Sequence, residues 1–292
     1  MADAGRGARR RRAGGRSGTV RDGSGGASTI GGRIHPSAVI DRRAELDTSV
    51  EVGPGAVIGP KVKIGAATTI GPYTVIASNT TIGERNQIFQ FASIGEVTQD
   101  LKYHGEPSTL EIGDDNKIRE FTSIQRGTEG GGMVTRIGSD VLLMNYVHVA
   151  HDSIIGDHCI LANSTQIAGH CVLEEWVRAM GVVGVHQNCR IGTHAMLAAG
   201  SKVAQDVPPY AVVSGDRARL IGVHEELLKR RNFPPETVRE LKNAYRTLFY
   251  SKLTREDAIK QVLAEQSDSA EVRQVVEFIA NSKRGVVGRE RG

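Results

Sequence analysis

Two histidines and an aspartate stand close together in the segment NYVHVAHDSIIGD, residues 145–157. His148 and His151 are three residues apart, and Asp152 directly follows the second. A neutral imidazole can take a proton from an attacking hydroxyl group. A neighbouring carboxylate can fix the tautomer of that imidazole and stabilise the imidazolium that forms. These residue types therefore predict general acid–base chemistry, provided that the fold turns them into one site.

An aliphatic residue recurs every six residues on both sides of this segment. One register covers residues 34–94 and 112–124, and a second register covers residues 137–203. An amphipathic helix needs a period of about 3.6 residues, so this pattern does not predict one. A six-residue period is typical of short strands and tight turns stacked as a parallel β-helix. Three repeats make one triangular coil, and the handedness of the coil does not follow from the spacing.

The register also predicts which side chains face outward. His148 stands one residue before the inward Val149 and His151 two residues after it, so both imidazoles are expected on the outer wall. Cys159, Cys171 and Cys189 each follow an aliphatic residue by four positions, at the small inward place of the repeat. We expect these thiols to be reduced core residues in a cytosolic protein, with no metal to bind.

Two insertions interrupt the repeat, at residues 95–111 and 125–136. Loops that project from a rigid solenoid are favoured places for binding residues, although a tolerated surface insertion is the alternative. The first insertion carries Asp100, Lys102 and Tyr103, a dense polar set, and the second is rich in glycine. We expect the first insertion to be functional.

The ends of the chain differ from the repeat region, which we place at residues 34–216. Residues 1–33 hold eight Arg and two Asp, a net charge of +6, whereas the whole chain is +4, so residues 34–292 sum to −2. We expect residues 1–33 to form a disordered basic tail, with a targeting or anion-binding arm as the alternative. Nucleic acid is therefore not an expected partner. No apolar run approaches 18 residues, so no transmembrane segment is expected either.

A small helical domain is expected at residues 217–292. Two prolines in AQDVPPY stop strand addition, and the apolar spacing then becomes helical. Thr254 and Asp257 resemble a capping box that opens one of four helices.

Three classes of function fit an outward histidine on such a solenoid: an acyltransferase with a histidine base, a metal site shared between subunits, and a purely structural solenoid. The metal site is disfavoured because the histidines of neighbouring coils occupy different places in the hexapeptide and do not obviously converge. The structural class is disfavoured by the polar insertion and the basic LKRR segment. We therefore expect an acyltransferase without a metal or other cofactor.

Several segments together resemble one acyltransferase family: QFASIGEVTQDLKYHGEPSTLEIGDDNKIRE, NYVHVAHD, LANSTQIAGH, GVHQ, VAQDVPPY and LKRR. They are similar to the acyl-[acyl-carrier-protein]–UDP-N-acetylglucosamine O-acyltransferases, over about residues 34–285. The resemblance implies a left-handed parallel β-helix in a cytoplasmic homotrimer, with active sites between subunits. It further implies transfer of an (R)-3-hydroxyacyl group from acyl carrier protein to the 3-OH of UDP-N-acetylglucosamine, the first step of lipid A synthesis.

The resemblance also implies roles for single residues. His151 matches the general base and Asp152 the residue that supports it. Ala199 matches the position that closes the far end of an acyl groove, where some members have glycine. The expected substrate-binding residues are Asp100, Lys102, His148, His170, Gln187, Arg230 and Arg231, with Gly169 and His186 beside them.

The sequence departs from the family pattern at Gln125, where many members have histidine, and at His224, where asparagine is common. Glutamine cannot titrate, so position 125 is not expected to act as an acid or base here. A related N-acyltransferase that acts on a 3-amino sugar nucleotide is the alternative function. The two differ in the product bond, which is an ester in one and an amide in the other.

Overall fold

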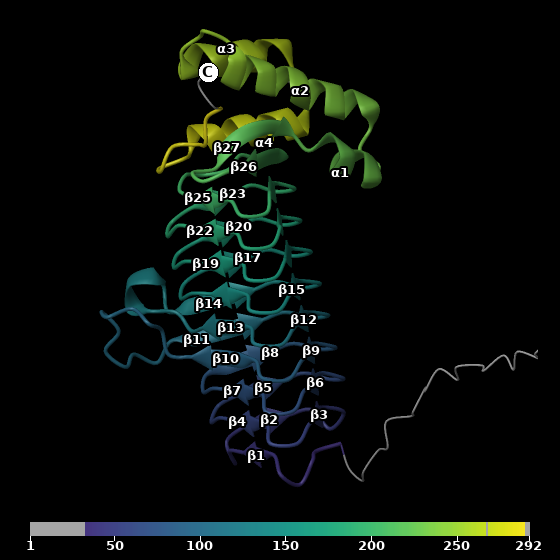
Figure 1. Ribbon diagram of the computed structural model, residues 1–292, viewed down its shortest axis with the longest axis vertical. Coiled ribbons are helices and arrows are strands. Elements are labelled where there is room, and N and C mark those ends of the chain that lie inside the picture. The colour runs from purple at the N-terminus through teal and green to yellow at the C-terminus, as the bar shows by residue number, and fades with distance from the viewer. Residues whose placement is uncertain (1–32, 267, 290–292) are drawn as a thin grey trace, which may run out of the picture. The chain divides into compact units, whose positions relative to one another are not determined.

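The computed structural model describes residues 33–266 and 268–289. The expected basic tail therefore lies, apart from Arg33, outside the described residues. From Ile34 onward, very short parallel strands stack into three sheets that wrap around one core (Figure 1). Strands pair with a partner 18 residues away in the uninterrupted coils, as in Val39↔Val57 and His148↔Gln166. Three hexapeptides thus make one coil, and the predicted parallel β-helix is confirmed.

The strands fall into three sheets, which we call I, II and III. Sheet I contains β1 (Val39–Ile40), β4 (Val57–Ile58), β7 (Val75–Ile76), β10 (Ser93–Glu96), β13 (Ser123–Gln125), β16 (His148–Val149), β19 (Gln166–Ile167), β22 (Gly184–Val185) and β25 (Lys202–Val203). Sheet II contains β2 (Glu45–Leu46), β5 (Lys63–Ile64), β8 (Thr80–Ile82), β11 (Thr109–Ile112), β14 (Val134–Ile137), β17 (Ile154–Ile155), β20 (Val172–Leu173) and β23 (Arg190–Ile191). Sheet III contains β3 (Glu51–Val52), β6 (Thr69–Ile70), β9 (Gln87–Ile88), β12 (Lys117–Ile118), β15 (Leu142–Leu143), β18 (Ile160–Leu161), β21 (Arg178–Ala179), β24 (Met196–Leu197), β26 (Ala211–Ser214) and β27 (Arg219–Val223).

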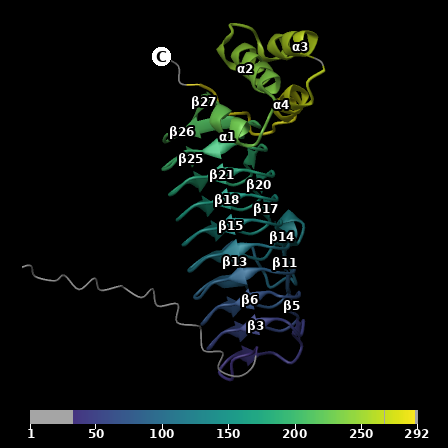
Figure 2. The same cartoon turned by 90° about the vertical axis from the view of Figure 1, so that its right-hand side faces the viewer.

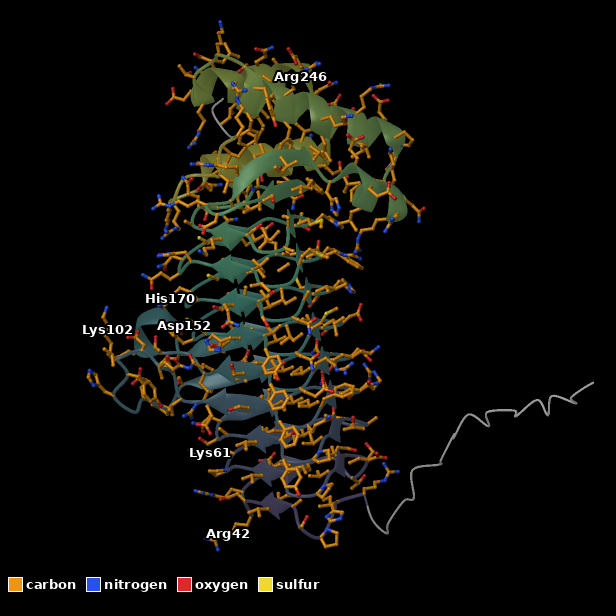
Figure 3. The ribbon with its side chains drawn as sticks, viewed as in Figure 1. Arg42, Lys61, Lys102, Asp152, His170 and Arg246 are labelled. Atoms are coloured by element: carbon orange, nitrogen blue, oxygen red, sulfur yellow. The ribbon has the colours of Figure 1, made fainter. Side chains whose placement is uncertain are left out.

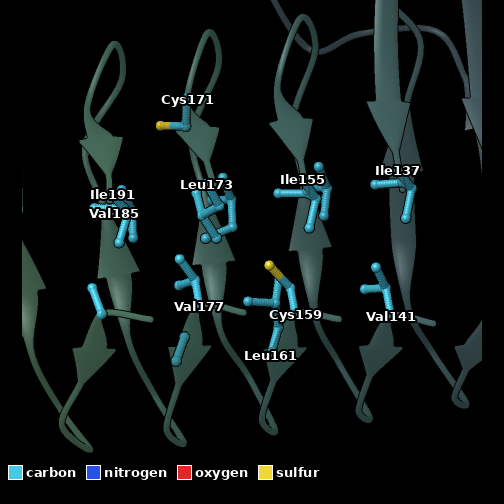
Figure 4. Close-up of a cluster of buried hydrophobic side chains, with 14 of the residues drawn as sticks. Ile137, Val141, Ile155, Cys159, Leu161, Cys171, Leu173, Val177, Val185 and Ile191 are labelled. Carbon is cyan, nitrogen blue, oxygen red and sulfur yellow. The ribbon is translucent and has the colours of Figure 1, made fainter. Parts of the chain in front are cut away.

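The aliphatic residue of each repeat fills the core. Ile155, Leu173 and Ile191 lie one above the other from coil to coil and are buried (Figure 4). The thiols of Cys159 and Cys171 share this interior, and all three cysteines are buried and free, as predicted. Burial raises the pKa of the Cys159 and Cys171 thiols to about 12, so these groups stay protonated and unreactive.

The chain runs from sheet I to II to III in each coil, and we name the three turns the I–II, II–III and III–I corners. The third residue of a four-residue corner has a positive φ, even where it is not glycine: φ is 54° at Tyr73, 59° at Asp152 and 59° at His170. Side chains at corresponding corner positions of successive coils therefore form columns. Asp152 and His170 belong to one such column, on the I–II corner.

Both insertions leave the stack at the I–II corner and project from it (Figure 1). The first connects β10 to β11 through residues 97–108, and the second connects β13 to β14 through residues 126–133, with a short 3₁₀ helix at Glu129–Gly131. Strands β10, β11 and β14 are four residues long, so part of each sequence insertion is ladder rather than loop. The two loops arise on adjacent coils and can therefore border one site.

The C-terminal part begins with an antiparallel pair, β26 and β27, at the end of sheet III (Figure 2). The helical segments that follow are α1 (Glu225–Arg230), α2 (Pro235–Tyr250), α3 (Arg255–Glu265) and α4 (Ala270–Ala280). The side chain of Thr254 accepts a hydrogen bond from the backbone N–H of Asp257, which confirms the predicted start of α3. Among the described residues, no helix is both long and apolar enough to cross a membrane.

Candidate active site

His151 and Asp152 are in contact as well as adjacent in sequence. The Nδ1 atom of His151 lies 2.8 Å from Oδ2 of Asp152. The side chain of Asp152 is 0% exposed and that of His151 is 14% exposed. The left-handed φ of 59° at Asp152 belongs to the corner geometry. A buried carboxylate against one ring nitrogen leaves the other nitrogen, Nε2, to act on a substrate.

The second insertion holds Asp152 in place. Thr128 donates twice to the carboxylate, from its backbone N–H to Oδ1 at 2.8 Å and from Oγ1 to Oδ2 at 2.6 Å. The backbone N–H of Asp152 donates to Oγ1 of Thr135 at 2.8 Å. Gly131 lies so close that a Cβ atom there would stand 1.9 Å from Cγ of Asp152. Sequence reasoning missed Thr128, and the glycine-rich insertion was the only available signal.

The next coil supplies the neighbours of the His151 ring. Its Gly169 lies 18 residues further, directly beside His151, and a Cβ there would stand 2.6 Å from Nε2 and Cε1 of the ring. Any side chain at position 169 would therefore displace the imidazole. Nδ1 of His170 lies 3.8 Å from Oδ2 of Asp152, and the rings of His151 and His170 meet edge to face with centroids 4.9 Å apart.

The first insertion brings Asp100 to the open side of His151. Oδ2 of Asp100 lies 4.0 Å from Nε2 of His151. The loop is fixed around Asp100, whose Oδ1 accepts from the backbone N–H of Lys102 at 3.0 Å and whose N–H donates to Oγ1 of Thr98 at 3.0 Å. A separation of 4.0 Å is too long for a direct hydrogen bond, so a polar group that contacts both side chains fits beside them.

His148 differs from His151 in its environment. It lies on β16, where its Nδ1 is 2.8 Å from Oγ of Ser123, and no carboxylate contacts it among the described residues. Burial lowers the pKa of His148, and the nearby His151 lowers it further. The ring is therefore neutral at pH 7 and suited to hydrogen bonding. Of the two histidines in the segment, only His151 has the partner that a general base needs.

One cavity of about 1540 Å³ joins most of the predicted site residues. Its lining residues come mainly from the first insertion, the I–II corner and sheet I. Figure 3 labels Lys102 and His170 of this lining, together with Asp152, which is buried and does not line the cavity. The predicted residues that line it are Asp100, Lys102, His148, His151, His170 and Gln187, and Gly169, His186 and the buried Gln125 line it as well.

Three predicted residues lie elsewhere in the chain. Arg230 and Arg231 are at the end of α1, and neither lines the cavity. The guanidinium carbon of Arg231 stands 3.5 Å from the ring centroid of Trp176 at the II–III corner, and Arg230 pairs with Glu226 at 3.0 Å. Ala199 is exposed at the III–I corner and also lies outside the cavity lining. Within one chain these residues do not meet His151.

Three side chains of the site could in principle hold a metal ion. One donor atom from each of His151, Asp152 and His170 lies within 4.8 Å of the others. Both carboxylate oxygens already accept a hydrogen bond from Thr128, however, and Oδ2 also contacts the ring of His151. A tetrahedral zinc site also needs its ligands to converge at about 2.0–2.2 Å. This donor set fits a hydrogen-bonded acid–base pair better than a metal centre.

A β-helix of hexapeptide repeats with an outward histidine–carboxylate pair in a cavity defines a transferase of the hexapeptide class. Residues 135–169 match the family model described as "Bacterial transferase hexapeptide (six repeats)". Residues 206–287 match the model described as "Udp N-acetylglucosamine O-acyltransferase; Domain 2". The first match covers the coils around His151, and the second covers the segment that carries α1–α4.

Known proteins narrow this class to one family. The chain is 50% identical over 258 residues to the acyl-[acyl-carrier-protein]–UDP-N-acetylglucosamine O-acyltransferase of Herminiimonas arsenicoxydans, covering 87% of this chain and 98% of that protein. It is similar to LpxA from Acinetobacter baumannii (TM-score 0.85, 42% identity, 87% of this chain and 99% of that chain). It is also similar to the UDP-N-acetylglucosamine O-acyltransferase from Moraxella catarrhalis (TM-score 0.84, 41% identity, the same coverage). The chain belongs to the acyl-[acyl-carrier-protein]–UDP-N-acetylglucosamine O-acyltransferase family, and its coils form the expected left-handed β-helix.

Proposed function

We propose that the protein transfers an (R)-3-hydroxyacyl group from acyl carrier protein to the 3-OH of UDP-N-acetylglucosamine, with His151 as the general base. This reaction is the first step of lipid A synthesis and takes place in the cytoplasm. The observation that carries the proposal is the 2.8 Å contact of the His151 ring with the buried Asp152, at the wall of a cavity large enough for two substrates. The names of the relatives supply the substrates.

The proposed reaction uses the two nitrogens of His151 differently. Nδ1 donates to Asp152, so the lone pair on Nε2 takes the proton of the sugar 3-OH. The hydroxyl oxygen attacks the thioester carbon, and a carbon–oxygen bond forms. When the tetrahedral intermediate collapses, the carbon–sulfur bond breaks and the imidazolium returns the proton to the leaving thiolate. Asp100, 4.0 Å from Nε2, orients the hydroxyl group.

The oxyanion of that intermediate needs a hydrogen-bond donor. The backbone N–H of Gly169 has no acceptor among the described residues, and Gly169 lies directly beside the His151 ring. We propose that it donates to the oxyanion. The missing Cβ at position 169 then has two consequences, since it makes room for the imidazole and lets the thioester approach the backbone.

We further propose that the enzyme is a homotrimer with sites completed by a neighbouring copy. Arg230, Arg231 and Ala199 lie away from the cavity in one chain and would reach it from a neighbour. An exposed column of stacked aromatic rings supports this, because an apolar surface of this kind usually marks an interface. The column runs along the III–I corner and consists of Tyr73, Phe91, Phe121 and Tyr146. Sedimentation that shows an active monomer would refute the trimer.

In this assembly Ala199 of the neighbour closes the acyl groove. Its methyl group takes about the space of one chain carbon, and overfilling a packed apolar site costs about 1–3 kcal/mol. We therefore expect Ala199→Gly to prefer an acyl chain one or two carbons longer than the wild type. Competition among 3-hydroxyacyl carrier proteins of graded length measures this, and identical length profiles would exclude Ala199 as the end of the groove.

Product analysis tests the proposed reaction. The protein is incubated with UDP-N-acetylglucosamine and a set of 3-hydroxyacyl carrier proteins, and the sugar nucleotides are analysed by mass spectrometry. We expect a mass gain of one hydroxyacyl group in a bond that mild base cleaves, as an ester is. An amide product that forms only from a 3-amino sugar nucleotide would support the N-acyltransferase instead, although the names of the relatives do not favour that reaction.

A further inference from the structure

Arg178 and Arg231 are neighbouring cations from different parts of the chain. Arg178 lies on β21 of sheet III, and Arg231 directly follows α1. Burial, and to a smaller extent the nearby charge of Arg178, lower the pKa of Arg231. Within residues 33–266 and 268–289 neither guanidinium forms an ion pair, and the Nε atoms of both are buried without a hydrogen-bond partner. A like charge and an unpaired buried donor are both unfavourable, and an anion that accepts from both Nε groups would relieve both.

Trp176 fixes the position of Arg231. The guanidinium carbon of Arg231 lies 3.5 Å from the centroid of the Trp176 ring. That ring stacks in turn on His158 and on His194, with interplanar angles of 17° and 5°. A guanidinium held flat on an aromatic face keeps its N–H edge free to bind, and its planar fork matches phosphate oxygens. Arg231 is therefore oriented for an anion without being neutralised by one of the chain's own carboxylates.

His224 adds a third unsatisfied nitrogen next to this pair. Its Nδ1 is buried without a hydrogen-bond partner in the described ranges, whereas its backbone N–H donates to the oxygen of Tyr210 at 2.8 Å. Burial lowers the pKa of His224, and the charges of Arg178 and Arg230 also lower it. Glu226 acts in the opposite direction but is paired with Arg230 at 3.0 Å. The charge of Arg178 thus acts on both Arg231 and His224, which places the three side chains in one cluster.

We propose that Arg178 is a further substrate-binding residue, which binds the diphosphate of the sugar nucleotide together with Arg231. This inference rests on the function proposed above, in which a neighbouring copy presents Arg231 to the cavity. Two guanidinium groups match a diphosphate, whose two phosphates both carry negative charge. The single phosphodiester on acyl carrier protein matches only one of them. Sequence reasoning missed Arg178, because it occupies an outward strand position that any polar residue can fill.

The variant Arg178→Met tests the proposal by separating binding from stability. Without ligand its midpoint of thermal unfolding should equal or exceed that of the wild type, because a like charge and an unpaired donor are removed. UDP should raise the wild-type midpoint, and the rise should be at most half as large in the variant. Uridine, which has no phosphate, should affect both proteins equally. We expect the KM for UDP-N-acetylglucosamine to rise about tenfold, with kcat within twofold and the KM for acyl carrier protein unchanged.

Arg190→Met is the matched control, because Arg190 has the partners that Arg178 lacks. Its Nη2 donates to Oε1 of Glu174 at 3.1 Å, and its guanidinium carbon lies 4.5 Å from the centroid of the Phe278 ring. This variant should lower the midpoint of unfolding and leave both the shift by UDP and the KM for UDP-N-acetylglucosamine unchanged.

Three results would overturn the proposal. One is a wild-type midpoint that UDP does not raise, and another is an Arg178→Met variant with the wild-type shift and KM. The third is a lower midpoint in Arg178→Met with the KM values of both substrates raised equally, which would make Arg178 a structural residue. If the proposed function itself is wrong, the wild-type protein will show no acyl transfer, whereas the comparison of UDP with uridine still decides whether Arg178 binds a diphosphate.

Discussion

Two histidine–aspartate pairs among the described residues have the same separation but different environments. Nδ1 of His151 lies 2.8 Å from Oδ2 of Asp152 at the I–II corner, and Nδ1 of His158 lies 2.8 Å from Oδ2 of Asp140 at the II–III corner. In the first pair the aspartate side chain is 0% exposed, and in the second it is 67% exposed. The short distance alone therefore does not identify a catalytic pair.

Two further features distinguish the His151–Asp152 pair from the His158–Asp140 pair. Thr128 fixes Asp152 from the second insertion, whereas within the described part of the chain no loop donates to Asp140 in this way. His151 opens on a cavity, whereas His158 stacks on Trp176 with ring centroids 3.9 Å apart. In this fold a wall histidine becomes functional where an insertion buries its carboxylate and a cavity receives its other nitrogen. The predictions below test that distinction, beginning with the largest effect.

Replacing His151 should have the largest effect. His151→Ala removes the general base, which typically contributes 10²–10⁴-fold, so we expect kcat to fall by about 10³-fold. The coil should persist, because the ring is outside the aliphatic core. Steady-state kinetics together with thermal unfolding measures both properties. A variant that keeps more than a tenth of the wild-type rate would exclude His151 as the base.

Asp152→Asn should come next, with a fall in kcat of about 10²-fold or more. The carboxylate accepts from Thr128 and from His151, whereas an amide offers a single accepting oxygen and directs its NH₂ group toward one of these donors. His151 then loses the partner that fixes its tautomer. Wild-type kcat in this variant, with an intact fold, would show that the buried carboxylate is structural only.

His194, at the II–III corner, should affect stability rather than catalysis. Its ring stacks between Trp176 and Tyr210. Burial, and to a smaller extent the nearby Arg231, lower the pKa of His194 to about 4. Between pH 6.5 and 4 the unfolded chain binds a proton that the folded chain does not, so falling pH favours unfolding. Protonation of this single group in the unfolded chain should lower the free energy of unfolding by at most about 3 kcal/mol between pH 7 and pH 4.

The His194 effect is measured as a difference between two proteins. Denaturant unfolding from pH 7 to 4 should show a shallower loss of stability for His194→Gln than for the wild type, with kcat at pH 7 within threefold. Parallel pH dependences for the two proteins would contradict the effect of burial on this group.

Much of this architecture could be predicted from the sequence, because every hexapeptide has the same local pattern. One inward aliphatic residue every six positions determines the coil, the outward histidines and the buried cysteines. The same period places Gly169 and His170 one coil beyond His151 and Asp152. These features depend on spacing alone, which a single sequence displays.

The remaining features depend on contacts that the spacing does not contain. The positive φ of Asp152 belongs to the corner geometry, and the hydrogen bonds from Thr128 cross 24 residues from an insertion without a repeat. The resemblance assigned Arg230 and Arg231 to the site, whereas in one chain they lie at the end of α1, with Arg231 over the ring of Trp176. Their proposed role requires a second copy, and no property of one sequence displays the position of that copy.

Thr128 should have a smaller effect than the pair it supports. Thr128→Val keeps the shape and the backbone N–H but removes the Oγ1 donor to Asp152. A hydrogen bond to a charged group contributes about 1.5–3 kcal/mol, and the remaining contacts preserve part of the geometry, so we expect a fall in kcat of about tenfold with KM unchanged. Thr128→Ser restores the hydroxyl and should recover most of the rate. Equal rates for the Val and Ser variants would mean that Oγ1 does not position Asp152.

The smallest effect should come from the second pair. His158→Ala removes an imidazole with the same 2.8 Å contact to an aspartate, but that contact is exposed to solvent and lies on another corner of the coil. An exposed contact of this kind contributes about 0–1 kcal/mol to the free energy of unfolding, and stacking on Trp176 contributes about 0.5–1.5 kcal/mol. The midpoint of thermal unfolding should therefore fall by a few degrees at most. We expect kcat to stay within twofold of the wild type. If instead kcat fell by tenfold or more with an unchanged midpoint, the II–III corner would contribute to catalysis, most directly through the Trp176 ring on which Arg231 lies. Burial of the carboxylate would then no longer distinguish the catalytic pair from the structural one.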